Sequence, residues 1–334
     1  MSRLSALASV VRATVPGLRA GKKTPLERAI QWVKAHTVPG SGILVHHQTR
    51  AVTQEVTGYF IPTLYNLGEQ QLAIDLARWE ASVQRADGAF AATDGTPYTF
   101  DTAQVVRGFI AVLDQLPELE GNLRRACDFV ESQIDPAGRV LSPSYGMWQV
   151  PGGGAFSEYT NLYVLPPLLE AGRVLAEATY VAAAERALRR FVGIPDLIEF
   201  KPNSSTLSHV YGYMMEALVE LGELTLARSG LQQVTAIQRD DGAIPAYPGV
   251  EWICSTGMAQ LGAAWYKLDD LDAADRALTY LETIQNPSGG FYGSYGVNAR
   301  YFPREEISWA VKFFLDCCFL RGQATQRAMP PAHH

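Results

Sequence analysis

The 334-residue sequence lacks several features that would assign it to a common functional class. It has no apolar run near the roughly 18 residues that a membrane-spanning helix requires. It has no dense stripe of lysine and arginine, and a formal net charge of −6 argues against nucleic acid as a partner. None of its four cysteines (Cys127, Cys254, Cys317 and Cys318) has CxxC spacing. We therefore expect reduced, buried thiols in a cytoplasmic protein that needs no metal and no cofactor.

The two ends of the chain differ in character from the rest. Residues 1–24 contain five basic side chains and no acidic ones, and Arg12 interrupts their short apolar stretch. A cleaved secretion signal is therefore not expected. The segment is predicted to be an N-terminal extension that frays, with weak association to a membrane surface as the alternative. We expect one domain over residues 25–321 and a disordered tail over residues 322–334.

One short pattern occurs three times. VQRADGAF (83–90), AIQRDDGAI (236–244) and TIQNPSGGF (283–291) each place a glycine four residues after a glutamine, with Phe or Ile two residues later. A longer version, DPAGRV, occupies residues 135–140. Each copy follows an amphipathic helical pattern, so each is predicted to be a corner that turns the chain back. Gly88, Gly242 and Gly289 are expected to have positive φ there.

Two kinds of helix alternate along the sequence. Amphipathic patterns cover residues 25–37, 72–84, 123–133, 182–194, 227–238 and 273–285. Patterns that are apolar on most sides cover residues 55–68, 101–116, 157–172, 207–222, 252–268 and 304–319. A helix that is apolar all round must be buried all round. The repeat of roughly 45–55 residues therefore predicts an all-α (α/α)6 toroid of six helical hairpins, with the apolar helices as its inner barrel.

The corner pattern resembles the QW-type repeat of squalene and hopene cyclases and of protein prenyltransferase β subunits, whose fold is an α/α toroid. Phe or Ile stands where the strict motif has tryptophan, and the DxDD acid of the cyclases is absent. Cys254 and His209 do not reproduce the zinc site of the prenyltransferases.

A closer resemblance extends over residues 55–320. It links the chain to bacterial toroid proteins associated with polysaccharide biosynthesis and, more distantly, to the helical domain of glucuronyl C5-epimerases and to toroidal polysaccharide lyases. The segments that carry it are EVTGYFIPTL, FDTAQVVRGF, SHVYGYMMEALVELG, WICSTGMAQL and EEISWAVKFFLD. This resemblance implies a glycan or a lipid-linked oligosaccharide as the substrate.

The first turns of the apolar helices are acidic and aromatic, whereas their middles are aliphatic. In a toroid these turns surround one opening, and aromatic faces with carboxylate acceptors suit a sugar ring. The predicted catalytic residues are His209, Tyr211, Asp101, Glu55 and Glu158. The predicted substrate-binding residues are Tyr59, Tyr98, Tyr159, Asn161, Tyr213, Trp252, Arg50, Trp148 and Glu305.

Three functions remain open from the sequence. The resemblance to lyases and epimerases implies removal of the C5 proton of a uronate, with His209 and Tyr211 as base and acid and Asn161 or Glu55 near the carboxylate. Alternatively, Asp101 and a second carboxylate hydrolyse a glycosidic bond. The third possibility is a glycan-binding protein without catalysis. Each single residue also has an ordinary explanation, because acids favour helix N-termini and a lone histidine often belongs to the core.

Overall fold

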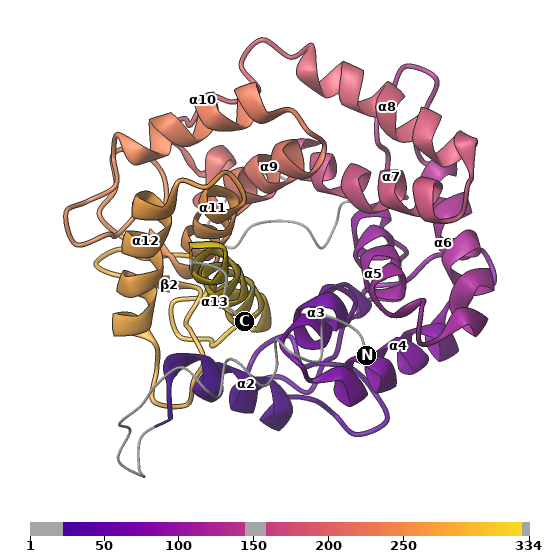
Figure 1. Ribbon diagram of the computed structural model, residues 1–334, viewed down its shortest axis with the longest axis horizontal. Coiled ribbons are helices and arrows are strands. Elements are labelled where there is room, and N and C mark those ends of the chain that lie inside the picture. The colour runs from indigo at the N-terminus through magenta and orange to yellow at the C-terminus, as the bar shows by residue number, and fades with distance from the viewer. Residues whose placement is uncertain (1–22, 144–157, 329–334) are drawn as a thin grey trace, which may run out of the picture.

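The computed structural model describes residues 23–143 and 158–328, and this part of the chain forms twelve α-helices in two concentric rings (Figure 1). The outer ring consists of α2 (Pro25–Ala35), α4 (Gln70–Val83), α6 (Glu120–Ser132), α8 (Ala178–Val192), α10 (Leu224–Thr235) and α12 (Leu271–Ile284). The inner ring consists of α3 (Gln54–Asn66), α5 (Thr99–Val112), α7 (Leu165–Val174), α9 (Ser208–Glu220), α11 (Ser255–Lys267) and α13 (Ser308–Ala328). The predicted all-α toroid of six hairpins is confirmed.

Short elements complete the described chain. Three 3-10 helices, η1 (Pro117–Leu119), η2 (Glu158–Val164) and η3 (Ser204–Thr206), precede α6, α7 and α9. Strands β1 (Ile253–Cys254) and β2 (Ser294–Tyr295) pair antiparallel, with Ile253 opposite Tyr295. Except for η1, which leads into the outer helix α6, these elements lie where the chain enters an inner helix or leaves a corner.

Burial explains why the inner and outer helices have different hydrophobic patterns in the sequence. Every residue of α11 from Ser255 to Tyr266 is buried, because other helices surround it. On α12 the buried residues are Ala273, Ala274, Ala277, Leu278 and Leu281, which form one stripe at helical spacing. The outer helices therefore keep a polar face and the inner helices do not.

The recurring glutamines make the same pair of hydrogen bonds in all three corners. The side-chain amide of Gln84 donates to the carbonyl of Gly88 at 3.0 Å and to that of Asn122, at the start of the next outer helix, at 2.9 Å. The amide of Gln238 donates to the carbonyls of Gly242 and Ala273 at 3.2 and 3.1 Å. The amide of Gln285 donates to the carbonyls of Gly289 and Pro25 at 3.0 and 2.9 Å. The last set joins α12 to α2 and closes the ring.

The corner glycines have the predicted conformation. Gly88, Gly242 and Gly289 have φ values of 85°, 90° and 95°. A Cβ atom at these positions would lie 2.1–2.2 Å from the backbone carbonyl oxygen of an arginine on the next outer helix, which is Arg125, Arg276 and Arg28 respectively. Glycine is needed both for its conformation and for this close approach.

Two boundaries differ most from the sequence prediction. Helix α13 continues to Ala328, so residues 322–328 are helical rather than a disordered tail; Ala324 is buried, and Arg327 pairs with Asp269 at 3.0 Å. The third inner helix begins as η2 and becomes α-helical only at Leu165, because Pro166 and Pro167 lack the N–H groups that an earlier α-helical start would use.

The two termini lie mostly outside the described residues. Thr24 begins α2 with a capping box that it forms with Glu27. Residues 1–22, with the predicted extension and membrane association, and residues 329–334 lie outside the described part of the chain. Within residues 23–143 and 158–328, no helix is both long enough and apolar enough to span a membrane.

Candidate functional site

A cluster of acidic side chains, tyrosines and one histidine lies where the inner helices begin. We call it the acid–tyrosine cluster, and its members are Glu55 and Tyr59 of α3, Asp101 of α5, Tyr163 of η2, His209 and Tyr213 of α9, and Tyr301 in the loop before α13. Ring centroids are 4.6 Å apart for His209 and Tyr213, 4.8 Å for Tyr213 and Tyr163, and 5.7 Å for His209 and Tyr301. Residues distant in sequence thus form one site.

Burial favours the neutral form of the carboxyl groups in and beside the cluster. Burial raises the pKa of Glu55 to about 8. Asp101 is 2% exposed, its Oδ1 has no hydrogen-bond partner among the described residues, and burial and the neighbouring Glu55 raise its pKa well above its usual value. Glu80 of α4 is fully buried, and burial followed by Asp101 raises its pKa as well. Near pH 7 these groups are therefore proton donors.

The tyrosines of the cluster also keep their protons. Burial raises the pKa of Tyr59 and of Tyr213 well above the usual value, and the nearby Glu55 adds to the shift in both. The hydroxyl of Tyr59 is buried and has no partner among the described residues. Tyr301 accepts a hydrogen bond from the indole of Trp309 at 2.9 Å.

His209 is the one member of the cluster that offers a nitrogen lone pair, and burial makes that nitrogen a weaker base than a free imidazole. Its side chain is 8% exposed, and burial lowers its pKa to about 4, against the opposing effect of a hydrogen bond with Gln260. That bond joins Nδ1 to Gln260 Oε1 at 2.7 Å. The imidazole is therefore neutral near pH 7, and it lies beside several proton donors.

A second group of side chains, which we call the charged belt, lies further along the inner helices. It consists of Arg107, Glu216, Glu220, Lys267, Lys312 and Asp316, and its ion pairs have separations of 2.7–3.2 Å. Arg107 also lies over the ring of Tyr163 at 4.6 Å, which connects the belt to the acid–tyrosine cluster. Burial alone would raise the pKa of Glu220, but Arg107 and Lys267 lower it to about 2.

Tyr211, the predicted acid, lies outside the cluster. Its hydroxyl donates to the carbonyl of Ile198 at 2.6 Å, and its ring stacks on Phe200 at 4.6 Å. Residues two apart on an α-helix point to different sides, whereas residues four apart share a face. Tyr213 therefore lies beside His209, and Tyr211 packs on the opposite side of α9.

The predicted residues of the third inner helix are also separated from the cluster. Glu158 is exposed, and Tyr159 lies near Asp196 and Lys201. The amide of Asn161 donates to the carbonyl of Val140 at 3.1 Å, so it holds the loop that contains Val140. In this 3-10 segment it is Tyr163 that reaches the cluster.

Four further predicted residues are described by the structure and are not members of the cluster. Tyr98 is buried at the start of α5, with its hydroxyl 3.5 Å from Asp94. Trp252 packs against Tyr247, at a ring separation of 5.7 Å, beside the short sheet. Arg50 is exposed in the loop before α3, and Glu305 lies near His46. Trp148 lies outside the described residues.

Sequence reasoning missed two important features of the site. Tyr301 precedes α13 by seven residues, and no helical periodicity indicates that its loop returns to the cluster. The charged belt could have been found in the sequence, because six ionisable residues lie within helices that are otherwise apolar. In the described chain, no group of three or more His, Cys, Asp or Glu side chains is placed to hold a metal ion.

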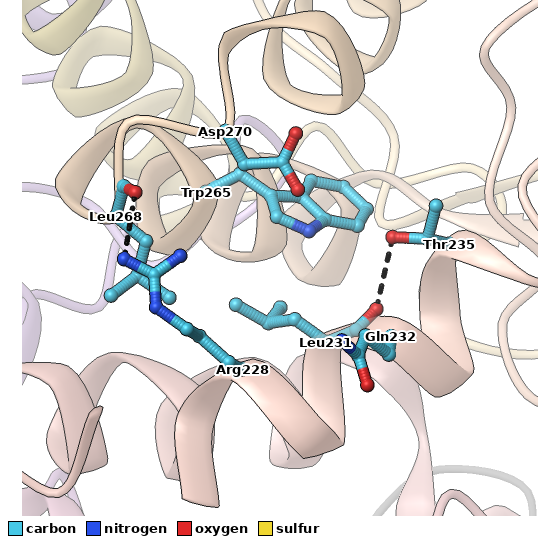
Figure 2. A pocket seen from close by; sticks show the side chains of 7 residues that line it. All are labelled: Arg228, Leu231, Gln232, Thr235, Trp265, Leu268 and Asp270. Carbon is cyan, nitrogen blue, oxygen red and sulfur yellow. Dashed lines mark hydrogen bonds between the residues drawn. The ribbon is translucent and has the colours of Figure 1, made fainter. Parts of the chain in front are cut away.

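A small pocket lies elsewhere, between α10 and the end of α11 (Figure 2). Its volume is about 80 Å³, and Arg228, Leu231, Thr235, Trp265 and Asp270 are among the residues that line it. In Figure 2 Arg228 reaches across to the carbonyl of Leu268, at 3.2 Å. Ligand sites usually have about 300–1,000 Å³. The pocket shares no residue with the acid–tyrosine cluster, and we do not assign it a substrate.

No protein-family model and no curated protein matches the sequence. An α-amylase from Clostridium perfringens is similar in structure, with a TM-score of 0.68, 11% identity, and coverage of 91% of this chain and 99% of that chain. A polysaccharide lyase gives a TM-score of 0.65 and 11% identity over 98% of this chain and 100% of its own. An unsaturated glucuronyl hydrolase specific for heparin has a TM-score of 0.65 and 12% sequence identity, with 98% of each chain covered. These identities show a shared fold.

Proposed function

We propose that the protein is a carbohydrate-active enzyme of polysaccharide metabolism that removes the C5 proton of a uronate residue. The observation that carries the proposal is the pairing of a neutral, buried His209 with tyrosines and neutral carboxyl groups in one cluster. A proton acceptor surrounded by proton donors is what such a reaction requires. Enzymes with the same fold include a polysaccharide lyase and an unsaturated glucuronyl hydrolase.

The reaction would follow from the protonation states of these groups. His209 takes the proton from C5, and the electrons of the C–H bond move into the substrate carboxylate. Glu55 and Asp101, both protonated, donate hydrogen bonds to the carboxylate oxygens and stabilise the added charge. Tyr213 replaces Tyr211 in the role of the acid, because it lies 4.6 Å from the imidazole ring.

Two outcomes are open to the same intermediate. If Tyr213 protonates the departing O4 oxygen, the C4–O4 bond breaks and an unsaturated uronate forms. If a proton returns to C5 from the other face, the product is the epimer. Both outcomes use the same base and the same carboxyl groups, so they share one set of tests.

Glycoside hydrolysis is the second candidate. It is favoured by the interaction between Glu55 and Asp101, and by the pKa of about 8 that makes Glu55 a general acid at neutral pH. Hydrolysis also needs an ionised carboxylate as base or nucleophile, however, and burial opposes ionisation of Asp101. We therefore rank it below removal of the C5 proton.

Product analysis on acidic polysaccharides in deuterated water tests the proposal. Elimination gives an unsaturated uronate that absorbs in the ultraviolet, and epimerisation incorporates deuterium at C5 without chain cleavage. New reducing ends with neither signal would replace the proposal with hydrolysis. Binding with no product at all would indicate a protein that binds glycans without catalysis.

A further inference from the structure

Gln260 of α11 makes a direct hydrogen bond to the imidazole of His209 on the neighbouring helix α9. The distance from Gln260 Oε1 to Nδ1 is 2.7 Å, and the glutamine side chain is fully buried. An amide oxygen accepts hydrogen bonds and cannot donate them, so this orientation of the Gln260 amide, which leaves its Nε2 buried without a partner among the described residues, places the proton on Nδ1. Because the imidazole is neutral near pH 7, its other nitrogen, Nε2, holds the lone pair.

The contact exists because glycines let the two helices approach closely. A Cβ atom on Gly212 of α9 would lie 2.6 Å from Cβ and 2.9 Å from Oε1 of Gln260. A Cβ atom on Gly257 of α11 would lie 2.3 Å from the backbone nitrogen of His209. Any larger residue at either position would separate the helices, so one glycine from each helix sets the distance between amide and imidazole.

Aromatic rings hold the imidazole on its other sides. The rings of Tyr213, Tyr301 and Phe313 lie 4.6, 5.7 and 6.4 Å from it. Gln260 is thus the only described residue with a hydrogen bond to the ring, and the aromatic neighbours restrict its rotation. The tautomer depends on Gln260, while the packing depends on the three rings.

We propose that Gln260 is a positioning residue that fixes His209 in the Nδ1–H tautomer, so that Nε2 is the nitrogen that takes the proton from the substrate. The part of this proposal that concerns catalysis rests on the function proposed above. The part that concerns the tautomer does not, and it can be measured without any substrate.

The first test is the ¹⁵N NMR spectrum of the full chain labelled at histidine, recorded at pH 7. We expect His209 to show a protonated Nδ1 and an unprotonated Nε2. Gln260→Met keeps the volume of the side chain and removes the acceptor, so it should shift His209 toward the Nε2–H tautomer. Gln104→Met is the matched control, because Gln104 is also a fully buried glutamine on an inner helix but bonds to the carbonyl of Phe100 at 3.3 Å.

Gln260→Glu gives a second measurement if Gln260→Met does not fold. A carboxylate next to the ring stabilises the imidazolium, so the midpoint of the His209 titration should rise by about 1–3 pH units. Gly212→Ala, which leaves both partners intact, should weaken the bond by displacing Gln260. A wild-type Nε2–H tautomer, or a His209 spectrum unchanged by all of these substitutions, would overturn the proposal.

Kinetics separate this inference from the proposed function. With a uronate substrate, Gln260→Met should lower kcat roughly 10-fold or more with little change in KM, and Gln260→Glu should move the lower limb of the pH profile upward. If the tautomer behaves as expected but no uronate exchanges its C5 proton, the proposed function fails and the role of Gln260 in fixing the tautomer stands. If C5 exchange occurs and neither the tautomer nor the pH profile responds, the role of Gln260 fails alone.

Discussion

Arg107 of α5 and Glu220 of α9 form an ion pair at 2.9 Å between two inner helices separated by 113 positions in the sequence. Their side chains are 15% and 22% exposed, and Lys267 of α11 pairs with the same carboxylate at 2.7 Å. Three inner helices are therefore connected through one glutamate. Removing one partner of such a buried pair leaves a charge that water cannot fully solvate.

Arg107→Met is expected to destabilise the protein by about 1.5–3 kcal/mol, because Glu220 loses one of its two charged partners and keeps Lys267 at 2.7 Å. Chemical denaturation followed by circular dichroism would measure the loss. The double variant Arg107→Met/Glu220→Gln should recover part of it, since the carboxylate that lost a partner is gone. Equal stability of the single variant and the wild type would mean that the pair of Arg107 and Glu220 contributes nothing to the barrel.

The pKa of about 8 at Glu55 predicts an upper limb in the pH dependence of activity. Glu55 must be protonated to donate, so the rate should fall as the pH rises through about 8, and Glu55→Gln should remove that limb. The unfolded protein releases this proton near its ordinary pKa of 4.5, so the free energy of unfolding should fall between pH 4.5 and 8. Glu118→Gln, at an exposed glutamate of η1, is the matched control and should change neither profile.

His209→Gln should affect both stability and rate. A histidine in a hydrated opening would cost little stability when replaced, but the side chain is buried and bonded to Gln260, so a loss of about 1–3 kcal/mol is expected. The rate of the folded fraction should fall about 100-fold or more. Melting curves paired with rates give both numbers. Normal specific activity in the folded fraction would assign His209 to the core alone.

Tyr213→Phe and Tyr211→Phe form a matched pair on one helix. Tyr213→Phe removes the proposed acid and should lower the rate about 100-fold or more while leaving the fold intact. Tyr211→Phe removes only the hydrogen bond to Ile198, which should cost about 1 kcal/mol of stability and no activity in the folded fraction. The reverse pattern of rates would return the role of acid to Tyr211.

Gly242→Ala and Gly222→Ala separate backbone strain from steric conflict. The two glycines have φ values of 90° and 84°, but a Cβ atom would lie 2.2 Å from the carbonyl oxygen of Arg276 only at Gly242, and at Gly222 it would meet nothing within 4 Å. Gly222→Ala should cost about 1–2 kcal/mol, the penalty of the left-handed conformation. Gly242→Ala should cost about 3 kcal/mol or more. Similar costs in denaturation would show that the corner can relax.

The fold could be predicted because the repeat of helix types and the residues of the corners indicate the same architecture. The alternation of amphipathic and wholly apolar helices indicates two rings, and a glycine four residues after a glutamine indicates each corner. The paired hydrogen bonds of Gln84, Gln238 and Gln285 were not predictable, because one of the two acceptors lies on the next outer helix. Helix ends were less certain, as Pro166, Pro167 and the extension of α13 to Ala328 show.

The site was predictable where helical spacing decides it. His209 and Tyr213 share a face of α9, and Glu55 and Tyr59 share a face of α3, so their place in one cluster follows from periodicity. Tyr211 was expected beside His209 and lies on the opposite side of α9, because closeness in sequence was taken for a shared face. Tyr301 could not be found at all, because a loop has no period that tells which way its side chains point.

The junction of α12 and α2, where the ring closes, has a consequence for circular permutation of the chain. The glutamine corner that joins α12 to α2 has the same hydrogen bonds and the same glycine–arginine approach as the corners inside the chain. Near this junction the indole of Trp32 on α2 also donates a hydrogen bond to the carboxylate of Glu306 at 2.7 Å. The junction near the chain's ends is therefore built like the junctions at Gln84 and Gln238. A circular permutant that links residues 25 and 328 by a flexible peptide and opens the chain at another corner should fold into the same ring.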